Sequence, residues 1–191
     1  PATNLLYVRT SEGGTPNQVC AIDPNVPDVD VPYTNNCARG ASPGIFQGLE
    51  GYVPIERSPL GPIPLIKPPY ARLVAIDLNA GDIAWSVPFG EGSRVMRNHP
   101  LLRDADLPDR LGTRGANGPM VTAGGLVFLG GGDPYLYAFD ASTGEEVTRL
   151  PTEFRTSGNP MSYRSRAGKQ FILIATGAGP DAKLVAFALP D

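Results

Sequence analysis

The amino-acid sequence predicts an all-β fold of repeated antiparallel sheets, and three observations support this prediction. Gly and Pro supply 23 and 21 of the 191 residues, close to twice their usual share. The apolar stretches between them are short and rich in Val, Ile, Leu, Phe and Tyr, which is typical of strands joined by turns. No stretch keeps a helical apolar period over three turns, so we expect little helix.

Composition and charge exclude several classes of function. The formal net charge is −3 and no basic run appears, which argues against nucleic acid or an anionic membrane as a partner. No apolar run approaches the ~18 residues that a membrane span needs. The chain opens PATNLLYV and enters a strand-like run at once, which is not the pattern of a signal peptide.

The first predicted sheet combines two stretches that lie far apart in the sequence. Residues 4–10 (NLLYVRT) and 72–87 (RLVAIDLNAGDIAWSV) both contain apolar, strand-like runs. The long insertion 11–70 separates them, and most of it is rich in turn-forming residues.

The insertion contains both cysteines of the chain, Cys20 and Cys37. They are either two buried thiols or a disulfide. The loop between them is polar and rich in Pro and Asn, a poor place to bury thiols, and this favours a disulfide and an oxidising compartment. With two cysteines and one histidine, the sequence has no zinc-finger, zinc-hydrolase or haem c pattern.

Two further units, residues 117–150 and 158–191, repeat one another. Each begins with Pro-Met and continues through a turn into an apolar strand, LVFL or FILI. A Gly-rich turn then leads to a second apolar strand, LYAFD or LVAFA, and the first unit has the corresponding pair LLYV and LVAID. Each unit predicts a meander of about four short antiparallel strands. Such sheets bury their faces when they stack radially, as the blades of a β-propeller do.

A short motif marks the units: an Ala, an Asp two residues later and a Gly four residues after that. It occurs as Ala75, Asp77 and Gly81 and again as Ala138, Asp140 and Gly144, whereas the third unit keeps only Ala186. We expect the Asp to accept hydrogen bonds from the following turn and the Gly to adopt a positive φ. Trp85 should lie across the junction with the adjacent sheet, and Thr148 takes its place in the second unit. These residues are expected to hold sheets together and to do no chemistry.

The motif Ala75-x-Asp77-x-x-x-Gly81-x-x-x-Trp85 resembles the tryptophan-docking motif of quinoprotein dehydrogenases. Those enzymes are propellers, typically of eight blades, that use pyrroloquinoline quinone (PQQ). The likeness extends over residues 58–191: SPLGPIPLIKPPYARLVAIDLNAGDIAW, GPMVTAGGLVFLGGG with YLYAFDASTGE, and the closing LVAFALPD resemble the last blades of membrane-type glucose and quinate dehydrogenases. Residues 1–191 would then form about three of the eight blades, a C-terminal part completed by the remaining blades or other polypeptide.

The resemblance implies an activity. Such enzymes oxidise the hydroxyl of an alcohol, polyol or sugar to a carbonyl, with PQQ and Ca²⁺ as cofactors, in a periplasmic or extracytoplasmic location. A carboxylate serves as the general base and the metal polarises the quinone. The family's catalytic Asp, metal ligands and lysine near the quinone lie in earlier blades, so we assign no catalytic residue and no metal ligand in this chain.

A non-catalytic PQQ-like propeller that binds other proteins as a scaffold is the alternative. Such propellers keep the repeated motif and lose the cofactor pocket. The long insertion and the Pro-rich segment SPLGPIPLIKPPY favour the enzyme, because scaffold propellers tend to have leaner blades.

Five residues are candidates for the wall of a cofactor pocket, because PQQ carries three carboxylates that cationic and amide groups can bind. Arg9 and Thr10 end the first candidate inner strand, Arg114 and Asn117 precede the Pro-Met pair of the second unit, and Asn159 precedes that of the third unit. The alternative for each is a solvated loop residue or a turn former.

Three other features are expected to be structural. His99, in RNHP, is predicted to be a surface loop residue, with a place in a substrate channel as the alternative. The acidic residues Asp104, Asp106 and Asp109 lack the Gly and the distant Glu of a calcium loop, so they predict an exposed loop with local ion pairs. Gly130-Gly131-Gly132 predicts a hairpin turn; no helix follows it, which argues against a phosphate-binding loop.

Overall fold

The computed structural model describes residues 3–12, 20–21, 33–34 and 66–190. They divide between two compact units, one of residues 1–12 with 67–191 and one of residues 13–66. In the latter, the short strands β2 (Cys20–Ala21) and β3 (Tyr33–Thr34) pair antiparallel. Cys37 lies outside the described residues, so the disulfide between Cys20 and Cys37 stays a prediction.

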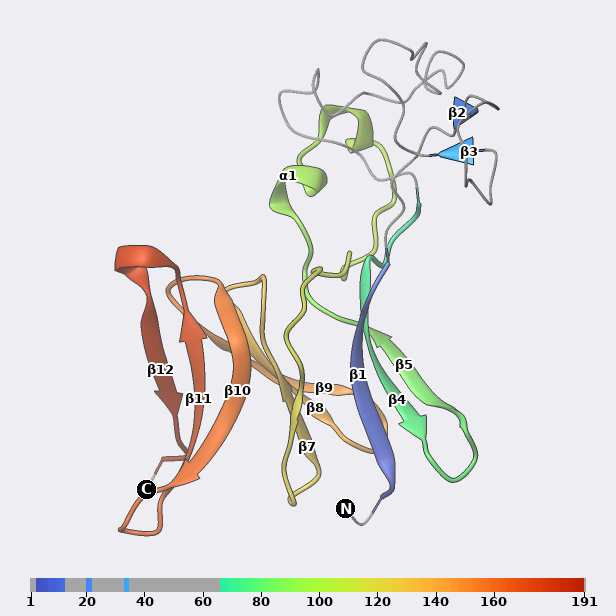
Figure 1. The fold of residues 1–191 in the computed structure, drawn as a ribbon. Coiled ribbons are helices and arrows are strands. Elements are labelled where there is room, and N and C mark those ends of the chain that lie inside the picture. Colours follow the sequence, from blue (N-terminus) through green and yellow to red (C-terminus); the bar gives the residue numbers. More distant parts are fainter. Residues whose placement is uncertain (1–2, 13–19, 22–32, 35–65, 191) are drawn as a thin grey trace, which may run out of the picture. The chain divides into compact units, whose positions relative to one another are not determined.

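The larger unit contains three antiparallel sheets (Figure 1). The first has the order β1 (Leu5–Ser11), β4 (Ala71–Asp77), β5 (Asp82–Pro88). The second has the order β6 (Met120–Val121), β7 (Leu126–Leu129), β8 (Tyr135–Asp140), β9 (Glu146–Pro151). The third has the order β10 (Thr156–Arg164), β11 (Gln170–Thr176), β12 (Lys183–Phe187). An all-β fold is confirmed.

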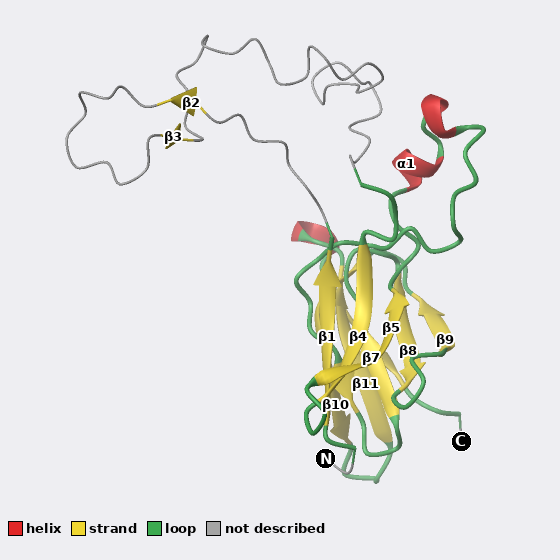
Figure 2. Cartoon of the chain, turned by 90° about the vertical axis from the view of Figure 1, so that its right-hand side faces the viewer, coloured by secondary structure: helices red, strands yellow, loops and turns green. Residues whose placement is uncertain are grey.

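Helical structure in the described ranges is short. It comprises α1 (Arg94–Arg97) and 3-10 turns at Pro100–Leu102 and Gly179–Asp181. Figure 2 shows α1 beyond the end of the sheets at which β1 stops. Within the part of the chain that the structure describes, no helix has the length and apolar character needed to cross a membrane.

Strand register makes the three sheets equivalent to one another. The motif alanine of each sheet lies opposite a large side chain on the preceding strand: Ala75 opposite Tyr7, Ala138 opposite Phe128 and Ala186 opposite Leu173. Strands β1, β7 and β11 are therefore equivalent, as are β4, β8 and β12. The four-stranded meander expected of each unit is complete in the second sheet. Among the described residues, the first sheet has no equivalent of β6 and the third has no equivalent of β9.

The two central strands of the second sheet, β7 and β8, are buried on both faces, which explains why they are apolar almost throughout. Side chains alternate between the two faces of a strand. One face of β7 and β8 packs against the first sheet, through Val127, Leu129, Tyr137 and Phe139. The other face packs against the third sheet, through Phe128, Leu136 and Ala138. The sheets thus stack face to face in chain order.

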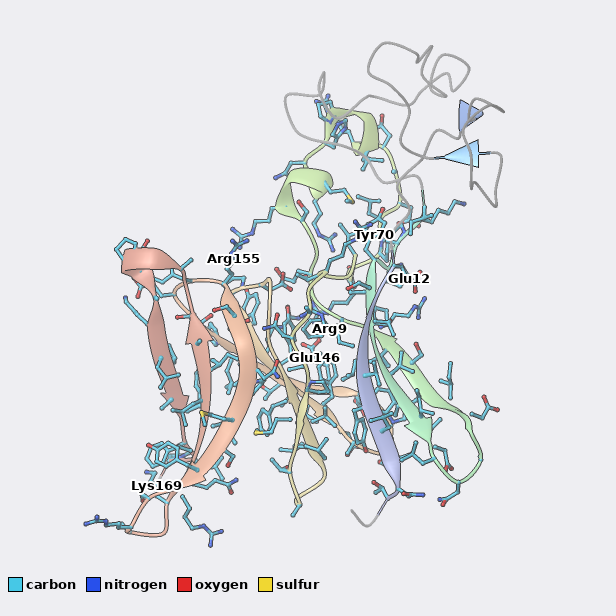
Figure 3. The ribbon with its side chains drawn as sticks, in the orientation of Figure 1. Arg9, Glu12, Tyr70, Glu146, Arg155 and Lys169 are labelled. Atoms are coloured by element: carbon cyan, nitrogen blue, oxygen red, sulfur yellow. The ribbon has the colours of Figure 1, made fainter. Side chains whose placement is uncertain are left out.

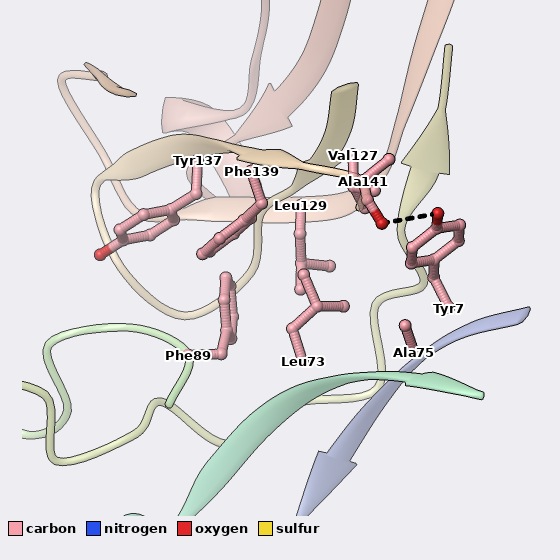
Figure 4. Packing of buried hydrophobic residues seen from close by; sticks show 9 residues of the cluster. All are labelled: Tyr7, Leu73, Ala75, Phe89, Val127, Leu129, Tyr137, Phe139 and Ala141. Atoms are coloured by element: carbon pink, nitrogen blue, oxygen red, sulfur yellow. Dashed lines mark hydrogen bonds between the residues drawn. The ribbon is translucent and has the colours of Figure 1, made fainter. Parts of the chain in front are cut away.

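The junction between the first and second sheets is built around Ala141, the residue after the second motif aspartate (Figure 4). Its carbonyl oxygen accepts hydrogen bonds from the hydroxyl of Tyr7 at 2.9 Å and from Nε1 of Trp85 at 3.1 Å. The indole covers Gly144 so closely that a Cβ atom there would lie 2.5 Å from Cε3 of Trp85. The predicted docking of Trp85 across the junction is confirmed.

The two motif turns adopt the predicted hydrogen bonding. Oδ1 of Asp77 accepts from the backbone N–H of Asn79 at 2.8 Å, and Oδ1 of Asp140 accepts from that of Ser142 at 2.8 Å. Gly81 and Gly144 have φ angles of 71° and 76°, in the left-handed region that glycine adopts without a steric cost. The Asp and the Gly therefore shape the turn on which a neighbouring sheet can pack.

Candidate functional site

A segment without regular structure, residues 113–118 (TRGANG), crosses from the first sheet to the third. We call it the crossing segment. The hydroxyl of Ser11, on β1, bonds to the carbonyl oxygen of Gly115 at 3.3 Å, and Oδ1 of Asn159, on β10, accepts from the N–H of Gly118 at 2.7 Å. The segment contains two of the five candidate residues and is held by a third, Asn159.

Arg9 anchors the crossing segment from the first sheet. Its Nη2 donates to the carbonyl oxygens of Thr113 at 2.5 Å and Gly131 at 3.0 Å. Its Nη1 donates to the carbonyl oxygen of Gly130 at 3.3 Å and to Oδ1 of Asn117 at 3.5 Å. The guanidinium also lies over the ring of Phe89, 4.7 Å from the ring centre. Both terminal nitrogens of Arg9 therefore already donate hydrogen bonds to protein acceptors.

Arg9 is a partly buried cation between the first and second sheets (Figure 3). Burial lowers the pKa of its guanidinium, and the carboxylate of Asp133 opposes that shift. The Nε atom is buried without a hydrogen-bond partner. An arginine in this setting acts through the fixed geometry of its donors as well as through its charge.

Two glycines give Arg9 and Asn117 the space for these contacts. A Cβ atom on Gly115 would lie 2.7 Å from Nη2 of Arg9, and one on Gly131 would lie 2.2 Å from Oδ1 of Asn117. Real Cβ contacts are essentially never that short. The glycines at these two positions are therefore part of the anchoring, and Gly131 also has a φ of 113°.

The structure brings the side chains of Arg9, Asn117 and Asn159 together at the crossing segment, whereas Arg114, which is itself in the segment, and Thr10 direct their side chains elsewhere. Thr10 follows Arg9 on β1, so its side chain lies on the opposite face of the first sheet. The guanidinium of Arg114 lies over the ring of Tyr70, 5.5 Å from its centre. Burial raises the pKa of the Tyr70 hydroxyl, and the charge of Arg114 opposes that shift.

Comparison with known proteins gives a family. The family model described as the β-propeller domain of PQQ-type glucose, ethanol and alcohol dehydrogenases matches residues 1–172. The chain belongs to this family of PQQ β-propellers. Its sheets are therefore propeller blades, in agreement with the resemblance that the docking motif carries.

Similar curated proteins have names that agree with this family assignment. The chain is 36% identical over 172 residues to a probable quinate dehydrogenase (quinone) of Xanthomonas campestris pv. juglandis, an alignment that covers 81% of this chain and 21% of that protein. It is 37% identical over 117 residues to the quinate/shikimate dehydrogenase (quinone) of Acinetobacter baylyi, covering 60% and 14%. It is 33% identical over 133 residues to the glycerol dehydrogenase large subunit of Gluconobacter thailandicus, covering 65% and 17%. The chain thus spans about a fifth or less of these relatives.

Asp133 is a buried carboxylate that the sequence did not single out. Its exposed fraction is 5%. Its oxygens accept from the hydroxyl of Thr113 at 2.6 Å, the N–H of Glu91 at 2.7 Å and the hydroxyl of Tyr137 at 2.9 Å. Burial and the Asp133 charge raise the pKa of the Tyr137 phenol, which keeps it a donor. With three donors, Asp133 fixes the start of the crossing segment against the second blade.

Four charged side chains link the second blade to the loop before the crossing segment. Arg110 donates to both carboxylate oxygens of Glu146, at 2.8 and 2.6 Å. Arg149 contacts Glu91 at 2.8 Å and Glu146 at 3.1 Å. The side chains are 22–37% exposed, so this chain of ion pairs is screened in part by solvent.

The prediction that His99 is a surface loop residue is wrong, because its side chain is buried, with 5% exposure. The loop around it folds back on itself. Arg97 donates to the carbonyl oxygens of Glu91, Pro108 and Asp109, and the carbonyl oxygen of His99 accepts from the N–H of Leu102. These bonds close the loop into a compact turn with the histidine inside it.

The acidic residues Asp104, Asp106 and Asp109 are exposed, as predicted. Their neighbour Arg110 pairs with Glu146 on β9, so one expected local ion pair is replaced by a contact between distant parts of the chain. Among residues 3–12, 20–21, 33–34 and 66–190, no group of three or more His, Cys, Asp or Glu side chains is placed to hold a metal ion. Gly130–Gly132 form the turn between β7 and β8, as expected.

Proposed function

We propose that the chain is part of a PQQ-dependent dehydrogenase that oxidises a hydroxyl of an alcohol, polyol or sugar to a carbonyl. The observation that carries the proposal is the family match over residues 1–172. The related proteins are named for quinate, shikimate and glycerol, which are polyhydroxylated compounds. A polyol or cyclic polyhydroxy acid is therefore the substrate class that we favour.

The donor set at the crossing segment suits PQQ. The oxygen of the Asn117 amide accepts from Arg9, and that of Asn159 accepts from Gly118. In each amide the nitrogen is left as the donor end. Together with the guanidinium of Arg114, these groups match an anionic cofactor that bears carboxylates. We propose that Arg114, Asn117 and Asn159 hold PQQ, and Thr10 stays a weaker candidate.

The cofactor would supply the redox chemistry and this chain would supply binding and orientation. PQQ accepts the two electrons released when the hydroxyl becomes a carbonyl, and Ca²⁺ is expected in the complete propeller. Asp133 is committed to three donors, so we assign it no part in proton transfer. The general base is expected in blades outside this chain.

We propose that further blades pack on both sides of the three described here, with residues 4–10 and 72–87, 117–150 and 158–191 as the blade repeats and 11–70 as an insertion. Large apolar side chains are exposed on the first and third blades, including Leu6, Ile83, Met161 and Leu184. The motif-alanine face of the first blade packs on the second, and that of the second packs on the third. The corresponding face of the third blade, with Ala186, is the surface on which a next blade would pack.

A periplasmic location is part of the proposal, and the predicted disulfide between Cys20 and Cys37 would agree with it. Intact mass of the purified protein with and without reductant tests the disulfide, which adds two hydrogens on reduction.

Activity measurements on the complete protein test the proposed function. The protein, loaded with PQQ and Ca²⁺, should reduce an artificial electron acceptor when supplied with a polyol or cyclic hydroxy acid. The matched control is the same protein without PQQ, which should be inactive. PQQ binding without oxidation of any alcohol, polyol or sugar would reject the dehydrogenase. A protein that binds no PQQ at all would favour a scaffold propeller.

A further inference from the structure

We infer that Arg9 is a positioning residue that sets the crossing segment for cofactor binding without itself binding the cofactor. This inference rests on the proposed function. Arg9 is on β1, and the groups that accept its hydrogen bonds are more than 100 positions away in the sequence. Arg9 therefore links three parts of the chain: the first blade, the crossing segment and the turn between β7 and β8. We call this set of contacts the Arg9 clamp.

The donor geometry of Arg9 supports this role. Each terminal nitrogen already has two protein acceptors, three backbone carbonyls and one side-chain amide in all. A guanidinium that turned toward a carboxylate of the cofactor would leave partly buried carbonyl oxygens without a donor, which is costly. The stacking on Phe89 at 4.7 Å further fixes the plane of the guanidinium.

The bond from Arg9 to Asn117 has a consequence for the amide. Because Nη1 donates to Oδ1, that oxygen must face Arg9, and the amide cannot turn over without placing two donors against one another. Arg9 thereby determines which end of Asn117 is a donor. Asn159 holds the other end of the segment through Gly118, so the segment is fixed at both ends.

Two substitutions separate positioning from charge. Arg9→Lys keeps the positive charge and loses the planar fork, so a residue that acted by charge alone would tolerate it. Gly115→Ala leaves Arg9 unchanged and inserts a Cβ atom 2.7 Å from its Nη2. A clamp should be disturbed by both. Arg72→Lys is the matched control, since Arg72 is on the neighbouring strand β4 and pairs with Glu12 at the surface.

The test combines hydrogen exchange and PQQ titration on the complete protein. We expect Arg9→Lys and Gly115→Ala to speed amide exchange in residues 113–118 and to weaken PQQ binding by roughly 10- to 100-fold. Exchange in β8 should stay slow, which shows that the fold is intact, and Arg72→Lys should change neither quantity. If Arg9→Lys fails to fold, Gly115→Ala, which keeps Arg9 and adds a Cβ atom beside its guanidinium, should still loosen the segment and weaken binding of PQQ.

Two results would overturn the inference: unchanged exchange in residues 113–118, or loosened exchange with PQQ affinity equal to that of the wild-type protein. Absence of PQQ binding to the wild-type protein would instead overturn the proposed function, and the inference with it. The exchange data distinguish these cases, because they are measured without cofactor.

Discussion

The two blade junctions of this chain are built differently. At the first, Trp85 and Tyr7 both donate to the carbonyl oxygen of Ala141, and the indole covers Gly144. At the second, Thr148 takes the position of Trp85, opposite the motif alanine Ala138. Aliphatic and aromatic packing around Ile174 then holds the blades together, with 1% of that residue exposed.

The second junction is joined without a docked indole. The second junction has a polar link at its end, because Thr156 donates to the carbonyl oxygen of Asp133 at 3.1 Å and accepts from the N–H of Gly131 at 2.6 Å. That link ties β10 to the turn between β7 and β8. A blade pair can thus be joined by a docked indole on its turn or by a threonine at the opposite end of the strands.

Removal of the docked indole should have the largest effect. Trp85→Ala should lower the free energy of unfolding by about 3 kcal/mol, because a large side chain and its hydrogen bond are lost together. Trp85→Phe keeps most of the packing and should cost about 1 kcal/mol. Chemical denaturation of the complete protein measures both. Equal stability of the alanine variant and the wild type would show that the first junction does not depend on Trp85.

A matched pair of glycine substitutions separates the steric contact with the Trp85 indole from the backbone strain of a positive φ. Gly144 and Gly81 both have positive φ, so alanine at either should cost about 1 kcal/mol. Only Gly144 lies under the indole, whereas a Cβ atom on Gly81 would meet nothing within 4 Å. Gly144→Ala should therefore be about 1–3 kcal/mol more destabilising than Gly81→Ala. The same loss of thermal stability in both would contradict the docking.

An indole added at the second junction should have little effect. Thr148→Trp restores the motif residue, but the third blade has Ala188 where the second has Asp140, so it lacks the aspartate that shapes the docking turn. We expect a change in the free energy of unfolding within about 0.5 kcal/mol. A clear gain in the denaturation midpoint would mean that the turn is not required for docking.

Acidification should weaken the hydrogen bonds that Asp140 accepts in the motif turn of the second blade. Hydrogen bonds from Ser142 and then from Thr143 lower the pKa of Asp140 below its usual value of 3.8. Since a lowered folded-state pKa stabilises the fold above the unfolded value, that contribution is lost as the pH falls below about 3.8 and through the folded pKa. The protection of the Ser142 and Thr143 amides, measured against their intrinsic exchange rates at each pH, should then fall. Asp140→Asn, which accepts without a charge, should show no such pH dependence.

The features that the sequence predicted correctly are the ones set by the spacing of neighbouring residues, such as the motif turns. The positions of Asp77, Asp140, Gly81 and Gly144 follow from turn chemistry, and the structure confirms their bonds and φ angles. The place of Trp85, four residues after Gly81, followed from the same repeated motif. These features need only a few neighbouring residues, and so they are visible in one sequence.

The geometry of the candidate site depends on contacts between residues far apart in the sequence, and the spacing of residues within a motif does not show such contacts. Asp133 is one Asp in a Gly-rich turn, and its partners Glu91 and Thr113 come from a different part of the chain. The sequence placed Arg9 among the candidates but could not show that its nitrogens meet backbone carbonyls. His99, a lone histidine next to a proline, predicts a surface loop residue, and the folding back of that loop around Arg97 reverses the expectation.

The most direct test of the account is a titration of PQQ into the purified complete protein and its Arg114→Gln variant, followed by the absorbance of the quinone. We predict that the wild-type protein binds one PQQ and that the variant binds it roughly 10- to 100-fold more weakly, because a charged hydrogen-bond donor is lost. Equal affinities would contradict the proposal that Arg114 holds PQQ. No binding by either protein would contradict the proposal that this propeller uses PQQ.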